Sequence, residues 1–136
     1  PMKLRPDLLE MPMDARLAYD QAGKLFFVNF EGLTIRSAAD IERIRAAVEA
    51  RVAPIGHKVS AVVNYDRFNI EPGLIDAYAA MVKKLVAAHY TSVTRYTSST
   101  FLRLQLGAAF TRSEQPPRMY GSVGEAQAGL AAGPAG

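Results

Sequence analysis

Hydrophobic and polar residues alternate along this chain with two periods, a short one typical of strands and a longer one typical of helices. Two short apolar runs, at 17–20 and 25–30, are separated by a turn that contains Gly23, and this pattern predicts a β-hairpin. The second run is apolar at nearly every position, so we expect a central strand that is covered on both faces.

A helical rhythm starts after the hairpin. Ser37 followed by Asp40 is typical of a helix N-terminus, and Pro54 with Gly56 is typical of a helix end. Between them, apolar residues recur at helical spacing: Ile41, Ile44, Val48 and Val52. The segment therefore predicts an amphipathic helix with one buried face.

The remainder of the chain continues to alternate strands with helices. In chain order it predicts a strand at 59–65, a loop at 66–72, a helix at 72–89, a strand at 92–96, a helix at 101–110, a short edge strand at 118–120 and a last helix from Ser122 to Leu130. The whole order is β-β-α-β-α-β-α-β-α. This order predicts an α/β fold with a mixed sheet, parallel in its later strands, and helices packed on it.

These elements form one expected domain at 16–130, with no internal repeat. A lead-in segment at 1–15 precedes it, and a tail of small residues and proline at 131–136 follows, which we expect to be frayed. The lead-in holds more apolar residues than a free tail: Leu4, Leu8, Leu9, Met11 and Met13. They indicate either a short helical turn or a connection to a preceding domain.

Composition excludes several classes of function. Basic residues exceed acidic ones only by 16 to 13 and form no run, so we expect no nucleic-acid surface, whereas an anionic small ligand stays open. The absence of cysteine excludes disulfides, thiolate nucleophiles and thiolate metal sites. No apolar run approaches the roughly 20 residues that cross a bilayer, and no signal peptide is visible. We therefore expect a cytoplasmic soluble protein that binds neither nucleic acid nor membranes.

Polar residues connect the predicted strand at 92–96 to the helix that follows. They are Arg95, Thr97, Ser98, Ser99 and Thr100. Backbone N–H groups at a helix start, together with hydroxyls and a cation, can bind a phosphate or a carboxylate. The same residues can instead cap the helix and extend the strand, and we favour this second interpretation.

Asn64 and Asp66 stand where a predicted buried strand ends and a loop begins. Ligands of open α/β sheets bind outside the carboxyl ends of the strands, so these two residues are candidates for ligand binding. Alternatively, their side chains hydrogen-bond their own backbone within the loop, which is the simpler interpretation. On the same loop, Phe68 is expected to be exposed as a docking contact, whereas most other aromatic residues are expected in the core.

No arrangement of catalytic residues stands out. Glu31 follows the second strand without an evident partner, and acid–base chemistry usually needs paired groups. His57 and His89 are the only histidines, too few for a metal site. We therefore expect no catalytic residue, no bound metal and no cofactor.

The element order, at this length, resembles the STAS fold of anti-sigma factor antagonists and sulfate-transporter tails. In antagonist STAS domains, an Asp-Ser-Ser-Gly-like turn after the middle strand carries a serine that is phosphorylated. The matching stretch at 64–73 contains neither serine nor threonine. The resemblance therefore covers the architecture and not the phosphorylation switch.

Local sequence also resembles the C-terminal extension of bacterial acyl-CoA:acetate/3-ketoacid CoA-transferase-like proteins. The resemblance spans about residues 1–121, including the lead-in, and lies in the segments 25–33, 63–66, 93–99 and 101–104. Family I CoA-transferases attack the acyl-CoA thioester with a glutamate beside a glycine-rich oxyanion loop, both in the upstream catalytic domains. Nothing here matches those residues, so the resemblance implies no catalytic residue in this chain.

The resemblance implies a non-catalytic accessory domain that serves packing, assembly or regulation. The parent enzyme would transfer CoA between an acyl-CoA and a carboxylate, so CoA would be a substrate of the parent. The implied partners are the upstream catalytic domain or a second copy of the chain. The alternative is a free-standing STAS-like module that binds a protein or an anionic ligand, and a reading frame that continues upstream of Pro1 would decide for the first hypothesis.

Overall fold

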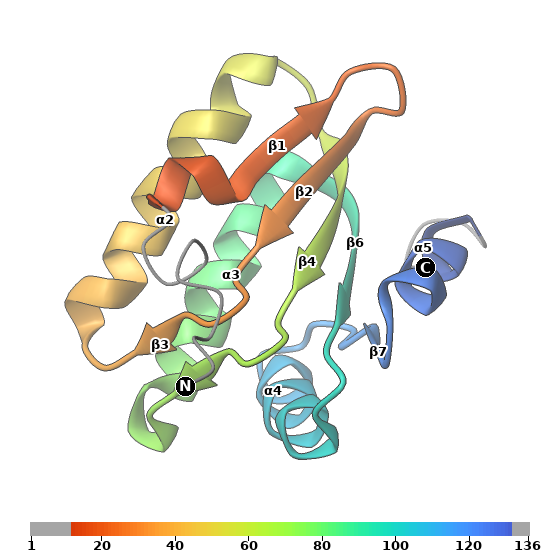
Figure 1. Ribbon diagram of the computed structural model, residues 1–136. Coiled ribbons are helices and arrows are strands. Elements are labelled where there is room, and N and C mark those ends of the chain that lie inside the picture. The colour runs from red at the N-terminus through yellow and green to blue at the C-terminus, as the bar shows by residue number, and fades with distance from the viewer. Residues whose placement is uncertain (1–11, 132–136) are drawn as a thin grey trace, which may run out of the picture.

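Strands and helices alternate around one mixed sheet in the computed structural model, which describes residues 12–131 (Figure 1). In chain order the elements are η1 Met13–Arg16, β1 Leu17–Asp20, β2 Leu25–Asn29, β3 Thr34–Ile35, α2 Ala38–Val52, η2 Ala53–Ile55, β4 Val59–Asn64, β5 Asn69–Ile70, η3 Pro72–Leu74, α3 Ile75–His89, β6 Tyr90–Tyr96, α4 Thr100–Arg112, β7 Met119–Tyr120 and α5 Val123–Ala131, where η marks a 3-10 helix. The predicted α/β class is confirmed, and so is the predicted order of the main elements. The structure adds two short strands, β3 and β5, to that order.

The five-stranded sheet has the order β1-β2-β4-β6-β7. β1 and β2 are antiparallel, whereas every later pair in this sheet is parallel, as the sequence predicted. β3 and β5 pair in parallel as a separate two-stranded sheet. Because β2, β4 and β6 are parallel neighbours, their carboxyl ends meet at one edge of the sheet.

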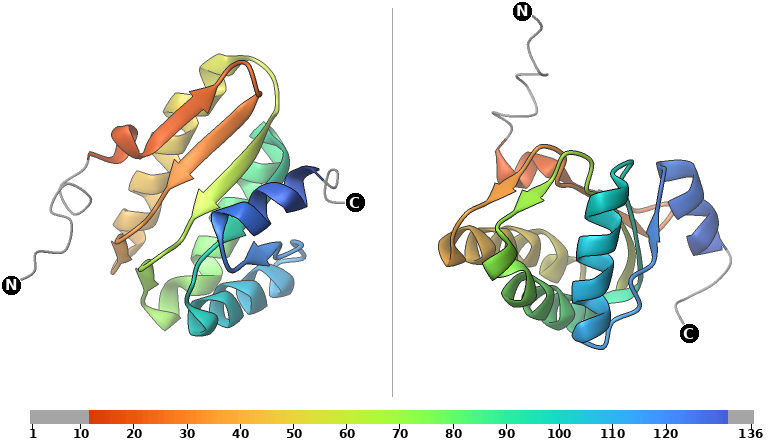
Figure 2. Two further views of the ribbon diagram at one scale, coloured as in Figure 1. Left: turned by 45° about the vertical axis from the view of Figure 1, so that its right-hand side comes forward. Right: turned by 90° about the horizontal axis from the view of Figure 1, so that it is seen from below.

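The two faces of the large sheet are covered differently (Figure 2). Helices α2 and α3 pack against each other behind one face, and α5 lies in front of the other face, against β6 and β4. The core lies on the face covered by α2 and α3, where Phe26, Ile44 and Tyr78 are at most 1% exposed. Burying an aliphatic or aromatic side chain of this kind stabilises a fold by about 1.5–3 kcal/mol, so this face supplies most of the hydrophobic stabilisation.

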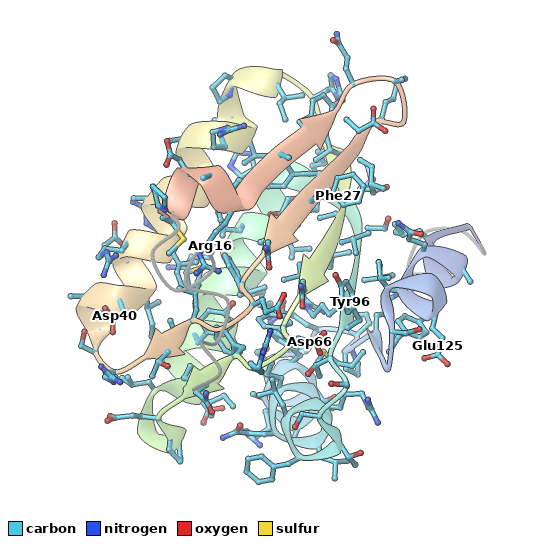
Figure 3. The ribbon with its side chains drawn as sticks, in the orientation of Figure 1. Arg16, Phe27, Asp40, Asp66, Tyr96 and Glu125 are labelled. Carbon is cyan, nitrogen blue, oxygen red and sulfur yellow. The ribbon has the colours of Figure 1, made fainter. Side chains whose placement is uncertain are left out.

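Three expectations about aromatic residues are wrong, the first being that Phe101 lies in the core, since it is 74% exposed on α4. Phe27 on β2 is 36% exposed, because α5 covers β4 and β6 but not β2 on that face (Figure 3). Phe68 is only 2% exposed and packs 4.9 Å from the Tyr65 ring and 5.6 Å from the Tyr78 ring, centroid to centroid. The cause is the turn at Arg67, whose φ of 55° folds the chain back towards the core just before β5.

The helix signals in the sequence are confirmed in detail. Serine side chains accept backbone N–H groups at the starts of α2, α4 and α5, through Ser37, Ser99 and Ser122. The 3-10 turn η1 begins at Met13, the last of the apolar lead-in residues, and the other four lie outside the described residues. The rest of the lead-in, 1–11, and most of the tail, 132–136, lie outside the described residues. None of the helices between residues 12 and 131 combines the length and the apolar character that a bilayer crossing requires.

Candidate functional site

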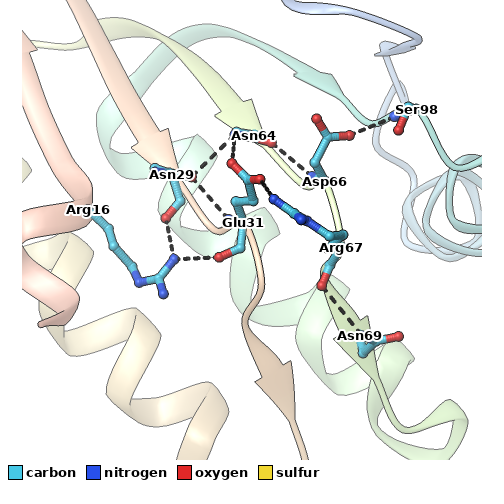
Figure 4. A network of polar contacts seen from close by, with 8 residues as sticks. All are labelled: Arg16, Asn29, Glu31, Asn64, Asp66, Arg67, Asn69 and Ser98. Carbon is cyan, nitrogen blue, oxygen red and sulfur yellow. Dashed lines mark hydrogen bonds and ion pairs between the residues drawn. The ribbon is translucent and has the colours of Figure 1, made fainter. Parts of the chain in front are cut away.

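The same four-residue pattern occurs at the carboxyl ends of β2 and β4, at 28–31 and 63–66. It consists of valine, asparagine, an aromatic residue and an acid. The parallel pairing places Asn29 opposite Asn64. The aromatic residues, Phe30 and Tyr65, turn into the core and are 4% and 1% exposed. The asparagines and acids are therefore left together at the sheet edge, where they form the polar cluster of Figure 4.

The two asparagines join the strand ends directly. Asn64 donates its side-chain N–H to Asn29 Oδ1 at 3.3 Å, and the same oxygen accepts the backbone N–H of Glu31 at 3.1 Å. Asn64 Oδ1 accepts the backbone N–H of Asp66 at 2.8 Å. These are the local side-chain-to-backbone turns that asparagine favours in loops, as the sequence indicated for Asn64.

Glu31 has side-chain partners on β4 and in the loop after β4, so the sequence-based interpretation that it lacks one is wrong. Its Oε1 accepts a side-chain N–H of Asn64 at 3.3 Å, and its Oε2 pairs with the guanidinium of Arg67. The Glu31 side chain is only 11% exposed. A carboxylate this buried needs such partners, because leaving it unpaired away from water is costly.

Arg16 ties the start of β1 to the same edge. Its Nη1 donates to the carbonyl oxygens of Asn29 at 3.1 Å and Glu31 at 2.8 Å. Burial lowers the pKa of Arg16, and the nearby Glu31 carboxylate partly opposes that shift. The guanidinium thus holds the backbone that leads out of β2.

Asp66 joins the loop after β4 to the loop after β6. Its Oδ1 accepts the backbone N–H of Ser98 at 2.7 Å. The two predicted ligand-binding segments therefore meet, and the Asp66 carboxylate already occupies one of the N–H groups that an added anion would use. Partial burial raises the pKa of Tyr96 at the end of β6, and the charges of Asp66 and Glu31 raise it further.

Three hydroxyls after β6 have local hydrogen-bond partners, and one of these contacts caps α4. Ser99 Oγ accepts the backbone N–H of Leu102 at 3.1 Å, and Thr97 Oγ1 accepts that of Ser99 at 3.2 Å. Thr100 Oγ1 accepts from Arg103 Nη2 at 3.3 Å. The Ser99 contact is the helix cap of the interpretation that we favoured from the sequence.

Arg95 lies apart from the other candidate residues, in the core on the side of the sheet that α2 and α3 cover. It is 1% exposed, its guanidinium carbon lies 4.0 Å from the centroid of the Phe110 ring, and its Nη1 donates to the carbonyl of Pro117 at 2.9 Å. Burial lowers its pKa, and the phenols of Tyr65 and Tyr78 oppose that shift. The structure thus unites Asn64, Asp66 and Ser98 but not Arg95.

The hydrogen bonds of the polar cluster connect the ends of β2 and β4 with the loops after β4 and β6. Sequence reasoning missed Arg16, Asn29 and Arg67, although the repeated valine-asparagine-aromatic-acid pattern at two strand ends was a visible signal for Asn29. Within residues 12–131, no group of three or more histidine or acidic side chains could hold a metal ion.

The fold and the cluster define the chain as an α/β domain with a mixed sheet whose parallel strand ends are cross-linked by polar side chains. Comparison with protein-family models, curated proteins and solved structures finds no match to this chain.

Proposed function

We propose that this chain is a non-catalytic accessory domain of a CoA-transferase-like enzyme, and that it acts by docking on the catalytic part through α4. The observation that carries the proposal is that α4 is apolar on two opposite sides. One side, with Leu102, Leu106 and Phe110, is buried in the domain. The other side presents Phe101 and Leu104, which are 74% and 70% exposed.

The exposed side of α4 has the spacing of a docking stripe. Phe101, Leu104 and Ala108 follow one another at intervals of three and four residues, so they share one helix face. Large apolar side chains grouped on a surface mark interaction sites more often than isolated ones do. Aromatic side chains such as Phe101 are also enriched at protein interfaces.

The polar cluster supports a structural role for the sheet edge. The segments that resemble the CoA-transferase extension contain Asn29, Glu31, Asn64, Asp66 and Ser98. In the structure these residues bond to one another or to nearby backbone, and Glu31 is held in an ion pair. Residues committed to holding the loops in place fit a domain whose parent houses the bond-making chemistry elsewhere.

The test is association with the catalytic domains of an acyl-CoA:acetate/3-ketoacid CoA-transferase-like protein encoded in the same genome. We expect sedimentation velocity to detect a complex at about 100 µM or below, and Phe101→Ser with Leu104→Gln to weaken it at least about tenfold. Val123→Ser is the matched control, because Val123 is an exposed apolar residue on α5. Absence of a complex, equal weakening by the control, or thioester exchange by this chain alone would overturn the proposal.

A STAS-like module that binds a protein partner is the second candidate, and the order β1-β2-β4-β6-β7 with one antiparallel hairpin favours it. It uses the same α4 stripe, so the two candidates differ in what lies beside the domain. Sequencing the gene upstream of the Pro1 codon separates them: catalytic CoA-transferase domains in frame favour the first candidate, and a start codon favours the second.

A further inference from the structure

One edge of β6 is only partly paired. β7 pairs with β6 at Arg95 and Tyr96, and no other strand within residues 12–131 pairs with this edge (Figure 1). β6 begins at Tyr90, so no strand pairs with the stretch 91–94 on the side of β7, although Ser92, Val93 and Thr94 are buried. A strand edge of this kind is a template for another extended chain.

The backbone of Val93 presents its polar groups to that open edge. On β6, the N–H groups of Arg95 and Thr97 donate to carbonyls at Arg118 and Tyr120, on the side of β7. Alternate residues of a strand direct their N–H and C=O groups to the same edge. The backbone N–H and C=O of Val93 therefore point to the same edge of β6 that β7 pairs with at Arg95 and Tyr96.

A cavity of about 350 Å³ lies beside this open edge. Its lining includes apolar Val86 and Ala87 of α3 and Pro116, and the basic residues Lys83 and Arg118. The cavity is large enough for side chains of a bound segment, and its position next to Val93 lets a segment pair with β6 and fill the cavity together.

The charge of the cavity selects an anionic occupant. Its lining carries Lys83, Arg95 and Arg118 against a single carboxylate, Glu114, whose Oε1 pairs with Lys83 Nζ at 3.3 Å, so two cations have no opposing charge in the lining. Arg118 Nε and Gln115 Oε1 are buried atoms of this lining, and neither forms a hydrogen bond with any group of residues 12–131. A carboxylate beside Arg118 and a backbone N–H beside Gln115 are the groups that match these atoms.

We infer that the open edge of β6 at 91–94 is a strand-addition site for an extended acidic segment of a partner protein. The segment extends the large sheet by pairing with Val93 and places acidic side chains in the cavity between α3 and the residues before β7. This site is separate from the α4 stripe, so the inference does not depend on the proposed function.

The probe is an octapeptide of alternating threonine and glutamate with blocked ends, because its β-branched residues favour a strand and place all carboxylates on one face. We expect amide exchange by NMR to show Val93 exchanging fast in the free protein and slowing at least about tenfold in the presence of millimolar peptide. The matching peptide of threonine and lysine should leave Val93 unprotected.

Matched variants locate the site on the protein. Lys83→Glu and Ala87→Trp reverse the charge of the cavity or fill it, and each should weaken peptide binding at least about tenfold. Lys84→Glu and Ala88→Trp make the same changes at exposed neighbours on α3 outside the cavity lining, and should leave binding unchanged. All four positions are exposed on a helix, so each variant should fold.

Several outcomes would overturn the inference. They are no binding of the acidic peptide at millimolar concentration, binding that Lys83→Glu and Ala87→Trp leave intact, and equal protection by the lysine peptide. Free glutarate that protects Val93 as well as the peptide does would identify a small-carboxylate site in place of strand addition, and would equally contradict it.

Discussion

The carboxylate of Asp66 accepts the backbone N–H of Ser98 at 2.7 Å, across two loops that lie 32 residues apart in the chain. A charged acceptor on a backbone donor is stronger than a neutral hydrogen bond. This contact fixes the loop after β4 against the segment that starts α4. The contact thus adds to the packing of α4 in holding the start of this helix, where Phe101 is exposed.

Removing the Asp66 carboxylate should destabilise the domain. We expect Asp66→Ala to lower the free energy of unfolding by about 1–2 kcal/mol, and Asp66→Asn by less, because the amide oxygen can still accept the Ser98 N–H. Urea denaturation measures the difference. Asp76→Ala is the control, since Asp76 pairs with Arg112 at an exposed site and should change stability by less than about 0.5 kcal/mol. Equal effects of the two alanine variants would contradict the role of Asp66.

The Glu31–Arg67 pair should show energetic coupling. Arg67→Ala removes one charged partner of a carboxylate that is 11% exposed, so we expect a loss of about 1–3 kcal/mol in unfolding free energy. Adding Glu31→Gln removes the charge that needs a partner, and should recover part of that loss. A double-mutant cycle in urea should give a coupling of about 1 kcal/mol; a coupling near zero would mean that the two side chains act independently.

Arg95 should tolerate an apolar substitute of its own size better than a small one. Arg95→Ala opens a cavity beside Phe110 and leaves the carbonyl groups of Pro116 and Pro117 without their donor, so we expect a loss of about 3 kcal/mol. Arg95→Met keeps most of the volume and should cost about 1–2 kcal/mol less than alanine. Calorimetry or urea denaturation compares the two, and a methionine variant less stable than the alanine variant would contradict this packing role.

Stability should fall at alkaline pH because of the buried tyrosines. Burial raises the pKa values of Tyr65, Tyr78 and Tyr90 above the ordinary value for tyrosine. Above about pH 10 the unfolded chain loses phenol protons that the folded protein keeps, so unfolding becomes easier as the pH rises, by up to about 1.4 kcal/mol per pH unit for each tyrosine. The stabilising effect is complete below that pH and is lost above it.

Tyr90→Phe tests this pH dependence. The variant should match the wild type at pH 7 within about 0.5 kcal/mol and lose less stability between pH 8 and pH 11, by about 1 kcal/mol. Urea denaturation along a pH series gives both values. Identical alkaline slopes for the two proteins would assign the loss to other groups.

Periodicity and capping chemistry were sufficient to predict most of the fold. The strands, the hairpin and the serine caps followed from local patterns, because alternating apolar residues, Gly23 and hydroxyls act within a few positions of the chain. β3 and β5 did not follow, since each has two residues and neither is long enough to show a period. Their pairing, Thr34 with Asn69, depends on how distant segments meet.

The candidate site was predictable only in part for the same reason. Asn64 and Asp66 were found because they follow a recognisable strand. Arg67 was not, because its contact with Glu31 depends on a left-handed backbone at a non-glycine residue. Nor did helical spacing alone reveal that Phe101 is exposed, since α4 is apolar on two sides and only the fold decides which side is buried.

The parallel pairing of β2, β4 and β6 has a kinetic consequence. Each of these ladders joins segments that are separated by a complete helix, whereas only β1 and β2 meet through a tight turn. Closing such long loops costs conformational entropy before the strand contacts that offset it can form. This topology therefore folds more slowly than a helical bundle of equal length. The hairpin is the one part of the sheet that can assemble from its immediate neighbours, and the rest of the sheet has to wait for α2 and α3 to return the chain to it.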